Sequence, residues 1–449
     1  MAVDMSQHFT TGGLLRFTAP SVGMLIFISI YSVVDGFFVS NFVGSSALAA
    51  VNLAFPVVMI LGTIGYMMGT GGSALVGKVR GEGDDERANR LFSLFVYASI
   101  VGGLLFTAIG IPLLRPLFQM MGATGDMLEL AVEYGTILMV GLVFDVLQYS
   151  FQSFIITAGK PSMGFMVTVA AGVTNMALDV LFIGVFGWGV AGAAWATVAG
   201  VVVGGLVPLV YFARPNDSAL RLCKTRLDWR SLGKAAANGL SEMVTNIAIS
   251  LVSIVYNIQL ISMIGADGVA AYGVIMYVMF VFAGAFLGYS VGCAPLMSFQ
   301  YGAQNKAEMQ SLFKKSIGII GICGILMFAA TRVAAAPLAG LFVGYDEGLL
   351  SLTEHAFTLY SSAFLLMGFN VYASSLFTSL GNGLVSALIS FLRSLVIEIG
   401  SVILLPMVLG PDGIWLSVVV AEAVAIVISG AFVLWLAPHY GYLRKRTSA

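Results

Sequence analysis

The sequence predicts an all-α polytopic membrane protein in which twelve transmembrane helices form two six-helix lobes. Three observations support this: an apolar composition, twelve long apolar spans, and an internal repeat that divides the chain in half. The 449 residues are 59% hydrophobic and 10% charged, with a mean hydropathy of +0.97, whereas soluble domains carry roughly 25% charged residues. So little charge cannot cover a water-exposed surface, and we therefore expect the chain in a lipid bilayer.

The apolar spans are long enough to cross that bilayer. A transmembrane helix needs about 20 mostly apolar residues, and this length gives twelve candidate spans. The spans are 14–40, 50–77, 91–114, 127–150, 161–185, 190–213, 237–263, 270–299, 313–335, 351–378, 385–408 and 413–436. A transmembrane β-barrel would need alternating segments of about ten residues, and the sequence has none.

Basic residues in the connections predict the orientation, because cytoplasmic loops carry an excess of Lys and Arg. With the first residues in the cytoplasm, the inner side receives Arg16, Lys78, Arg80, Arg87, Arg90, Lys160, Arg214, Arg221, Lys224, Arg226, Arg230, Lys234, Lys306, Lys314, Lys315, Arg444, Lys445 and Arg446. The outer side receives only Arg115 and Arg332. We therefore expect a multi-pass protein of the cell (plasma or inner) membrane with both termini in the cytoplasm. We also expect a monomer.

An internal repeat relates the two halves of the chain. "VGSSALAAVNLAFPV" aligns with "IGADGVAAYGVIMYV" at a shift of 221 residues. The same shift pairs Gly44 with Gly265, Gly81 with Gly302 and Gly192 with Gly413. Each half holds six spans, and an even number returns the chain to its starting side. The halves therefore share one orientation, as in transporters with a parallel pseudo-two-fold axis along the membrane normal. The predicted division is an N-lobe at 1–213, a cytoplasmic connector at 214–236 and a C-lobe at 237–449.

A duplicated bundle leaves a cleft between its halves as the natural place for a substrate. Rocking of one half against the other would expose that cleft to each side in turn. The alternative is that the duplication only builds a large, stable bundle. Ionisable residues inside the spans favour transport, because such residues are expensive in a bilayer and commonly functional.

The N-lobe spans carry a group of acidic and polar residues. Asp35 lies within "YSVVDGFFVS", where a bare carboxylate costs on the order of 2.5–3.5 kcal/mol. Asn175 and Asp179 are four residues apart and share a helix face. If the fifth span faces the first, the two carboxyl groups approach each other through this amide, and they can take up a proton or bind Na⁺. Tyr31 and Thr197 would add hydroxyl groups. The alternative is a polar network that only holds helices together, and for Asp145 in the fourth span both interpretations stay open.

The C-lobe spans carry ionisable residues at other depths. Glu242 lies early in the seventh span, Arg393 and Glu398 lie in the eleventh, and Glu422 lies in the twelfth. Arg393 and Glu398 are five residues apart, so they do not face each other on a straight α-helix. One interpretation is a structural network in which the glutamates pair with Arg393 or with polar groups, while Arg393 extends to the inner interface. The other is a second cation or proton site.

Several other functions are excluded or disfavoured by the sequence. A net charge of −1 indicates nothing about partners, but a protein that binds nucleic acid would need a basic patch or stripe of a size that this sequence lacks, so we expect no nucleic acid as a partner. The cysteines and histidines have no metal-ligand spacing, so we expect neither a structural metal nor a cofactor. No Walker motif indicates direct use of ATP, and no nucleophile with a base indicates an enzyme. A receptor or scaffold would not explain the buried acids.

A proline interrupts the first span. Pro20 removes a helix hydrogen bond and kinks the helix, about 15 residues or ~22 Å from Asp35. Protonation of Asp35 would then be coupled to bending at Pro20. The alternative is a static kink.

The chain resembles the multidrug and toxic compound extrusion (MATE) family along essentially its whole length. The resemblance rests on "VDGFFVSNFVGSSALAAVNLAFPV", on "NMALDVLFI" followed by "GVAGAAWATVAG", and on "GLSEMVTNIAISLVSIVYN". It implies two lobes in a V around a central cleft, and cation-coupled export of organic cations and other amphipathic compounds.

The resemblance also implies roles for individual residues. Asp35 resembles the family's first-span aspartate, which is proposed to bind the coupling ion. Asn175, Asp179 and Thr197 match polar partners in the N-lobe cavity of prokaryotic members, and Pro20 matches a proline at which the first span bends. The chain departs from some relatives because Glu242 comes early in its span and the tenth span has no acid. That departure argues against a C-lobe sodium site of their kind.

The predicted function is secondary antiport of small organic cations or amphipathic drugs against H⁺ or Na⁺, with the coupling ion at Asp35 and Asp179. A membrane potential supplies about 2.3 kcal/mol per charge at 100 mV. The alternative within the wider superfamily is a flippase or exporter of a lipid-linked or amphipathic metabolite. Such a protein should show extra spans or a strongly basic central cavity.

Overall fold

The computed structural model describes residues 3–42, 45–344 and 346–443. Over these residues the chain is almost entirely helical and contains no strand. Twelve of its helical stretches are long and apolar enough to cross a membrane, in the order that the sequence predicts. The all-α class and the number of spans are therefore confirmed.

The first half of the chain forms one bundle, and several of its spans are composite. Its elements are α1 (Thr11–Phe42), α2 (Ser45–Tyr66), the π-helix η1 (Met67–Gly71), α3 (Gly72–Gly81), α4 (Asp85–Met120), α5 (Gly125–Thr157), α6 (Pro161–Asp179), the π-helix η2 (Val180–Val185) and α7 (Gly189–Ala213). The second span thus runs through α2, η1 and α3, and the fifth through α6 and η2.

The second half forms the other bundle after a connector that contains the short helix α8 (Trp229–Asn238). Its elements are α9 (Leu240–Met263), α10 (Ala266–Gly302), α11 (Lys306–Val343), α12 (Glu347–Tyr360), the 3₁₀ turn η3 (Ser361–Ala363), α13 (Phe364–Ser379), α14 (Gly383–Ser390), the π-helix η4 (Phe391–Glu398), α15 (Ile399–Leu409) and α16 (Pro411–Tyr440). The tenth span therefore runs through α12, η3 and α13.

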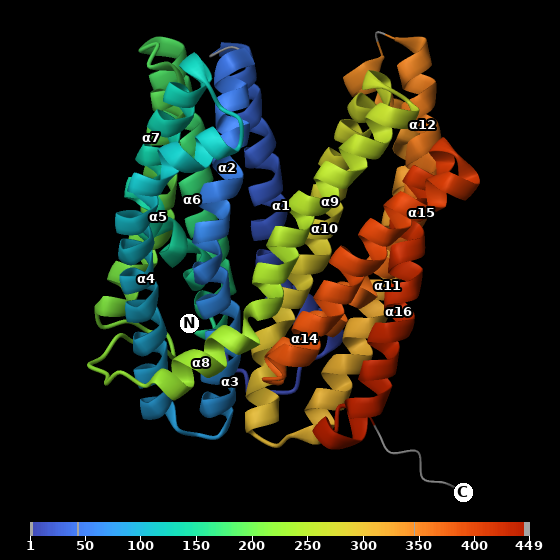
Figure 1. Cartoon of the computed structure of the whole chain (residues 1–449). Coiled ribbons are helices and arrows are strands. Elements are labelled where there is room, and N and C mark those ends of the chain that lie inside the picture. Colours follow the sequence, from blue (N-terminus) through green and yellow to red (C-terminus); the bar gives the residue numbers. More distant parts are fainter. Residues whose placement is uncertain (1–2, 43–44, 345, 444–449) are drawn as a thin grey trace, which may run out of the picture.

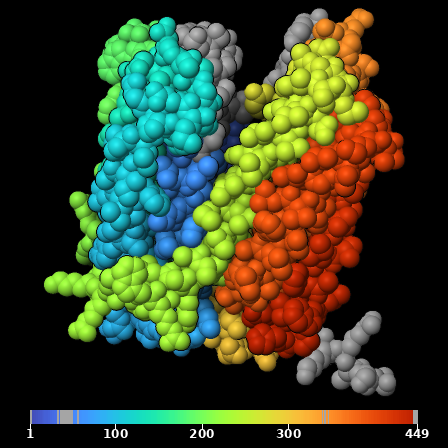
Figure 2. Space-filling model, viewed as in Figure 1, coloured from blue at the N-terminus to red at the C-terminus, as the bar shows by residue number. Residues whose placement is uncertain are grey.

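The two bundles form a V (Figure 1). They diverge towards the upper end of the view and meet at the lower end, where the α3–α4 turn, the connector and the α10–α11 turn lie. In the space-filling view the surface is hollowed between the bundles in its upper half (Figure 2). We call the lower end the basic end, because the Lys- and Arg-rich connections gather there.

Two glycines bring the lobes together at the basic end. Gly81 ends α3 and Gly302 ends α10. A Cβ atom at Gly81 would lie 2.0 Å from the Phe299 carbonyl oxygen, and one at Gly302 would lie 1.9 Å from the Lys78 carbonyl oxygen. Lys78 and Phe299 are related by the same shift of 221 residues as the glycines. The contact is thus symmetric, as the predicted pseudo-two-fold axis requires.

Helix α1 lies between the lobes, packed against α10 of the other half. At Gly288, a Cβ atom would lie 2.5 Å from the Val22 Cα atom, so the two backbones are in close contact. Further along, the Ser29 Oγ donates a hydrogen bond of 3.1 Å to the Phe280 carbonyl oxygen. Pro20 lies inside α1 on this interface stretch. A bend at Pro20 would therefore change the contact between the lobes.

Candidate functional site

The first predicted site depends on how α1 lies against α6. Close contacts join Gly23 to Phe165 and Tyr31 to Gly172, where a Cβ atom on each glycine would lie 3.1 Å from the facing ring. The two residues of each contacting pair are separated by nearly the same number of residues in the sequence. Helices α1 and α6 therefore lie side by side and run in the same direction. One turn beyond Tyr31, this register brings the α1 backbone at Asp35 level with residues 175–179. The side chain of Asp35 lies outside the described residues.

Asn175 and Asp179 of α6 are buried, and Asn175 faces α7. Asn175 is 4% exposed and Asp179 is fully buried. The Asn175 Nδ2 donates to the Thr197 Oγ1 at 3.5 Å, and that hydroxyl donates to the Ala193 carbonyl oxygen at 3.1 Å. Among the described residues, none donates a hydrogen bond to the Asn175 Oδ1. The structure thus brings Asn175 and Thr197 together and leaves one buried amide oxygen open as an acceptor.

Asp179 lies where the α-helix of the fifth span ends. The π-helix η2 begins at the next residue, so the backbone changes its pitch directly after the carboxylate. π-segments inside helices occur frequently at functional sites. The burial of Asp179 and this change of pitch distinguish it from an ordinary helix residue.

A second polar cluster in the N-lobe centres on Asp145 of α5. The Tyr149 phenol, one turn along the same helix, interacts with the Asp145 carboxylate, and its ring stacks on Tyr66 with centroids 4.1 Å apart. Tyr31 lies near enough to interact electrostatically with both tyrosines. Tyr66 and Tyr149 were missed in the sequence, where the only signal is the spacing of four residues in "DVLQY".

A small pocket lies where the two lobes meet. It is lined by Thr70, Ser73, Ala74 and Ser153 from the N-lobe, and by Glu242, Val291, Ala294, Ser375, Thr378 and Ser379 from the C-lobe. Six of these ten lining residues carry a hydroxyl group, and Glu242 contributes a carboxylate. Glu242 also lies near enough to Tyr66 to interact with it electrostatically. The predicted grouping of Glu242 with Arg393 is not seen, since Glu242 faces the junction between the lobes.

The other C-lobe residues form a buried network around Glu422, whose side chain is 3% exposed. The Arg393 Nη2 and Nε donate to the Glu422 Oε1 at 2.6 and 3.0 Å. The Asn370 Nδ2 donates to the Glu422 Oε2 at 2.7 Å, and the Ser429 Oγ donates to the Asn370 Oδ1 at 2.8 Å. Both carboxylate oxygens are therefore bonded, as a structural ion pair inside a bundle requires.

Glu398 lies beside this network because the helix changes its pitch. Arg393 and Glu398 both belong to the π-helix η4, in which hydrogen bonds join residues five apart. The two side chains interact electrostatically. The sequence prediction that these two side chains do not face each other assumed a straight α-helix. That assumption does not hold here, because this segment is a π-helix.

The chain forms two duplicated helical lobes, with buried polar groups in each lobe and a pocket at their junction. These features are typical of a membrane transporter. The sequence model of the MatE family matches residues 20–181 and 243–403, with one match in each half. The chain therefore belongs to the MatE family, as the resemblance implies, and it is a transporter rather than an enzyme.

Known relatives agree with this membership. The multidrug export protein MepA of Staphylococcus aureus (strain MRSA252) is 23% identical over 414 residues, which cover 91% of this chain and 90% of MepA. The crystal structure of a MATE protein in complex with MaL6 superposes with a TM-score of 0.90 at 24% identity, covering 96% of this chain and 97% of the other. A multidrug resistance MATE transporter of the MOP superfamily in an outward-facing conformation gives the same score and identity, covering 96% of each chain. These structures confirm the fold.

Proposed function

We propose that this chain is a secondary active antiporter that exports cationic or amphipathic organic compounds in exchange for H⁺ or Na⁺. The observation that carries this proposal is the buried pair Asn175 and Asp179, level with Asp35, in the lobe beside the cleft. The relatives named multidrug export proteins support the substrate class. The basic end would face the cytoplasm by the positive-inside rule, so that the V opens to the outside of the cell membrane.

The coupling ion would bind between α1 and α6. Carboxylate and amide oxygens are hard ligands that suit Na⁺, and a carboxyl pair in a low-dielectric site can instead share a proton. The open Asn175 Oδ1 supplies an acceptor at the place where Asp35 and Asp179 come level. Thr197 would hold the amide in position, and Tyr31, which packs against Gly172 of α6, would add a hydroxyl group.

The substrate would pass through the cleft to the pocket between the lobes. Tyr66 and Tyr149 stack on each other, and Tyr66 lies near Glu242 of the pocket wall; aromatic faces attract organic cations. Glu242 adds a negative charge among hydroxyl groups, which suits a cationic guest. Since both lobes line the pocket, their rocking would open it to one side and close it to the other.

Helix α1 would couple ion binding to the conformation of the cleft. This helix carries Asp35 and Tyr31, contacts α6 in its own lobe, and packs on α10 of the other. A bend at Pro20 would move the part of α1 that carries these contacts relative to the start of the helix, where Thr18 faces Gly292 of α10. We therefore propose Pro20 as the hinge that links ion binding to the position of the lobes.

Transport into inverted membrane vesicles tests this function directly. A fluorescent organic cation is supplied outside, and a pH gradient or a Na⁺ gradient is imposed separately. We expect uptake driven by at least one gradient and its collapse with the matching ionophore. Uptake that needs ATP, or no uptake under either gradient by a folded protein, would contradict the proposal. Transport of a lipid-linked compound alone would favour the flippase alternative.

A further inference from the structure

Residues 3–10, ahead of α1, form a non-helical segment that contacts both lobes at the basic end. We call this segment the clasp. On the N-lobe side, the Val3 backbone nitrogen donates to the Gly159 carbonyl oxygen at 2.9 Å. The Arg80 Nη1 lies 3.9 Å from the Met5 Sδ, and the same nitrogen donates to the Thr157 carbonyl oxygen at 2.7 Å.

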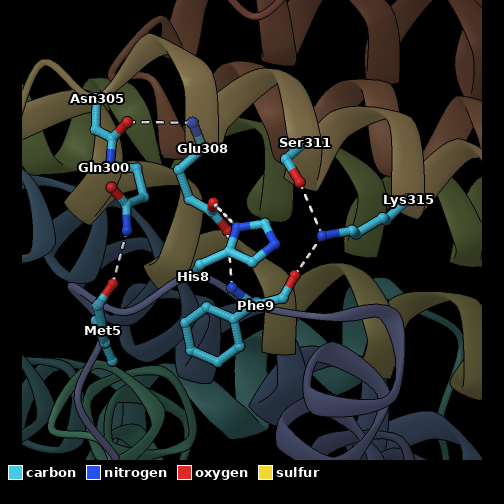
Figure 3. Close-up of polar contacts among 8 residues, drawn as sticks. All are labelled: Met5, His8, Phe9, Gln300, Asn305, Glu308, Ser311 and Lys315. Atoms are coloured by element: carbon cyan, nitrogen blue, oxygen red, sulfur yellow. Dashed lines mark hydrogen bonds and ion pairs between the residues drawn. The ribbon is translucent and has the colours of Figure 1, made fainter.

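The middle of the clasp is bonded to the C-lobe. The Gln300 Nε2 of α10 donates to the Met5 carbonyl oxygen at 2.7 Å. Glu308 of α11 bonds twice, to the His8 Nδ1 at 2.5 Å and to the Phe9 backbone nitrogen at 3.0 Å. The Lys315 Nζ donates to the Phe9 carbonyl oxygen. Figure 3 shows these side chains of α10 and α11 converging on the clasp.

The clasp is packed as well as hydrogen-bonded. Met5 is 1% exposed and Phe9 is 3% exposed, and both belong to the buried cluster that contains Met297 of α10. Phe9 also packs edge-on against Phe17 of α1, with ring centroids 5.8 Å apart. Glu308 is itself 5% exposed, so its bond to the Phe9 backbone nitrogen is shielded from water and is strong for a hydrogen bond to a charged group.

The order of these contacts along the clasp indicates how it would come apart. Val3 at one end is bonded to Gly159 of the N-lobe, and α1 at the other end packs on both lobes, with Gly23 against Phe165 of α6 and Thr18 against Gly292 of α10. The residues between Val3 and α1 are bonded to the C-lobe. The clasp therefore bridges the lobes. If the lobes separate at the basic end, the clasp must lose its bond to one lobe or the other.

We propose that the clasp is an inner gate, which holds the basic end closed while the cleft is open and releases Glu308 and Lys315 when that end opens. This inference rests on the alternating access proposed above. It assigns to the segment ahead of α1 a conformational role beside the helix packing at Gly81 and Gly302.

The labelling rate of a thiol buried between the lobes tests this gate. Ser298 of α10 is fully buried against Gly77 of α3, so a Ser298→Cys thiol reacts with a hydrophilic maleimide only when the basic end opens. The background lacks the native cysteines Cys223, Cys293 and Cys323. Loss of a hydrogen bond to a buried charge should raise the labelling rate about ten-fold or more in Glu308→Ala and in Lys315→Met.

Two controls separate opening from unfolding. His355→Ala removes a similar contact, the 2.8 Å bond from the His355 Nε2 to the Asp412 Oδ1 within the C-lobe, and should leave the rate unchanged. The second control is a separate protein that keeps native Cys293, which is buried inside the C-lobe. Its thiol would react only on global unfolding and should stay unreactive. An unchanged Ser298→Cys rate in both clasp variants, or an equal rise at Cys293, would overturn the gate. The assay needs no substrate or gradient, so its outcome is independent of the transport test.

Discussion

Gly81 and Gly302 occupy equivalent positions in the two halves, and each packs against the backbone of the other's helix. A Cβ atom would come within 2.0 Å of a carbonyl oxygen at Gly81 and within 1.9 Å at Gly302. No side chain rotation relieves contact with a backbone atom. Closure of the basic end therefore depends on the absence of a Cβ atom at both positions.

We predict that Gly81→Ala and Gly302→Ala each destabilise the closed lobes, by about 1–3 kcal/mol as for other overpacked sites. The measurement is the midpoint of thermal unfolding in detergent. Gly318→Ala is the matched control, because Gly318 lies inside α11 with no atom near its Cβ position. If all three variants unfold at the same temperature, the glycine contact does not hold the lobes.

The C-lobe ion pair yields a second prediction. Arg393→Met leaves Glu422 charged and buried, and breaking such a pair costs about 3–5 kcal/mol. The double variant Arg393→Met/Glu422→Met should recover most of that loss, since it removes both charges. The free energies come from a double-mutant cycle in denaturant. If the pair is structural, the refolded double variant still transports against a gradient, whereas loss of coupling would favour a second cation site.

The hydroxyl group of Thr197 provides a third test. Thr197→Val keeps the shape of the side chain but removes the group that accepts the Asn175 amide, so the amide loses its position. We expect gradient-driven export to fall about ten-fold, the effect of roughly 1.4 kcal/mol, with unchanged thermal stability. Thr174→Val is the control, because the one bond that the Thr174 hydroxyl makes among the described residues is to the Ala170 carbonyl oxygen of its own helix. Equal losses in both variants would argue against a role for the Asn175 amide.

Glu242 should affect substrate binding rather than coupling. Glu242→Gln removes the negative charge from the pocket wall and keeps its size. We expect KM for a cationic substrate to rise about ten-fold, which is the scale of one charge contact, while KM for a neutral amphipathic substrate changes little. The measurement is the concentration dependence of vesicle uptake for the two substrates. If KM for both substrates is unchanged but the ion gradient no longer drives uptake, Glu242 takes part in the coupling step instead.

Local patterns in the sequence were sufficient for the membrane fold. The apolar spans identify the twelve crossings, and the 221-residue shift pairs Gly81 with Gly302 as equivalent positions of the two halves. The spacing of Asn175 and Asp179 predicts a shared helix face because that segment of α6 is regular. Each of these conclusions depends on residues close together in the chain or on repetition of the whole half.

Long-range partners and changes of helix type were not predictable in the same way. Asn370 has no sequence feature that links it to Glu422, 52 residues away. The π-helix η4 invalidates a spacing argument for Arg393 and Glu398 that holds only for an α-helix. His8 and Phe9 lie in a short polar segment that resembles a solvated tail, and only the fold brings Glu308 to them.

The central claim is that a cation held near Asp35 and Asp179 drives export, and paired flux measurements test it most directly. In vesicles, Asp35→Asn and Asp179→Asn should abolish substrate movement driven by a gradient yet retain gradient-free exchange of labelled for unlabelled substrate. Asp126→Asn, at an exposed position of α5, should behave as the unmodified protein. Unimpaired gradient-driven export in either of the first two variants would contradict the account.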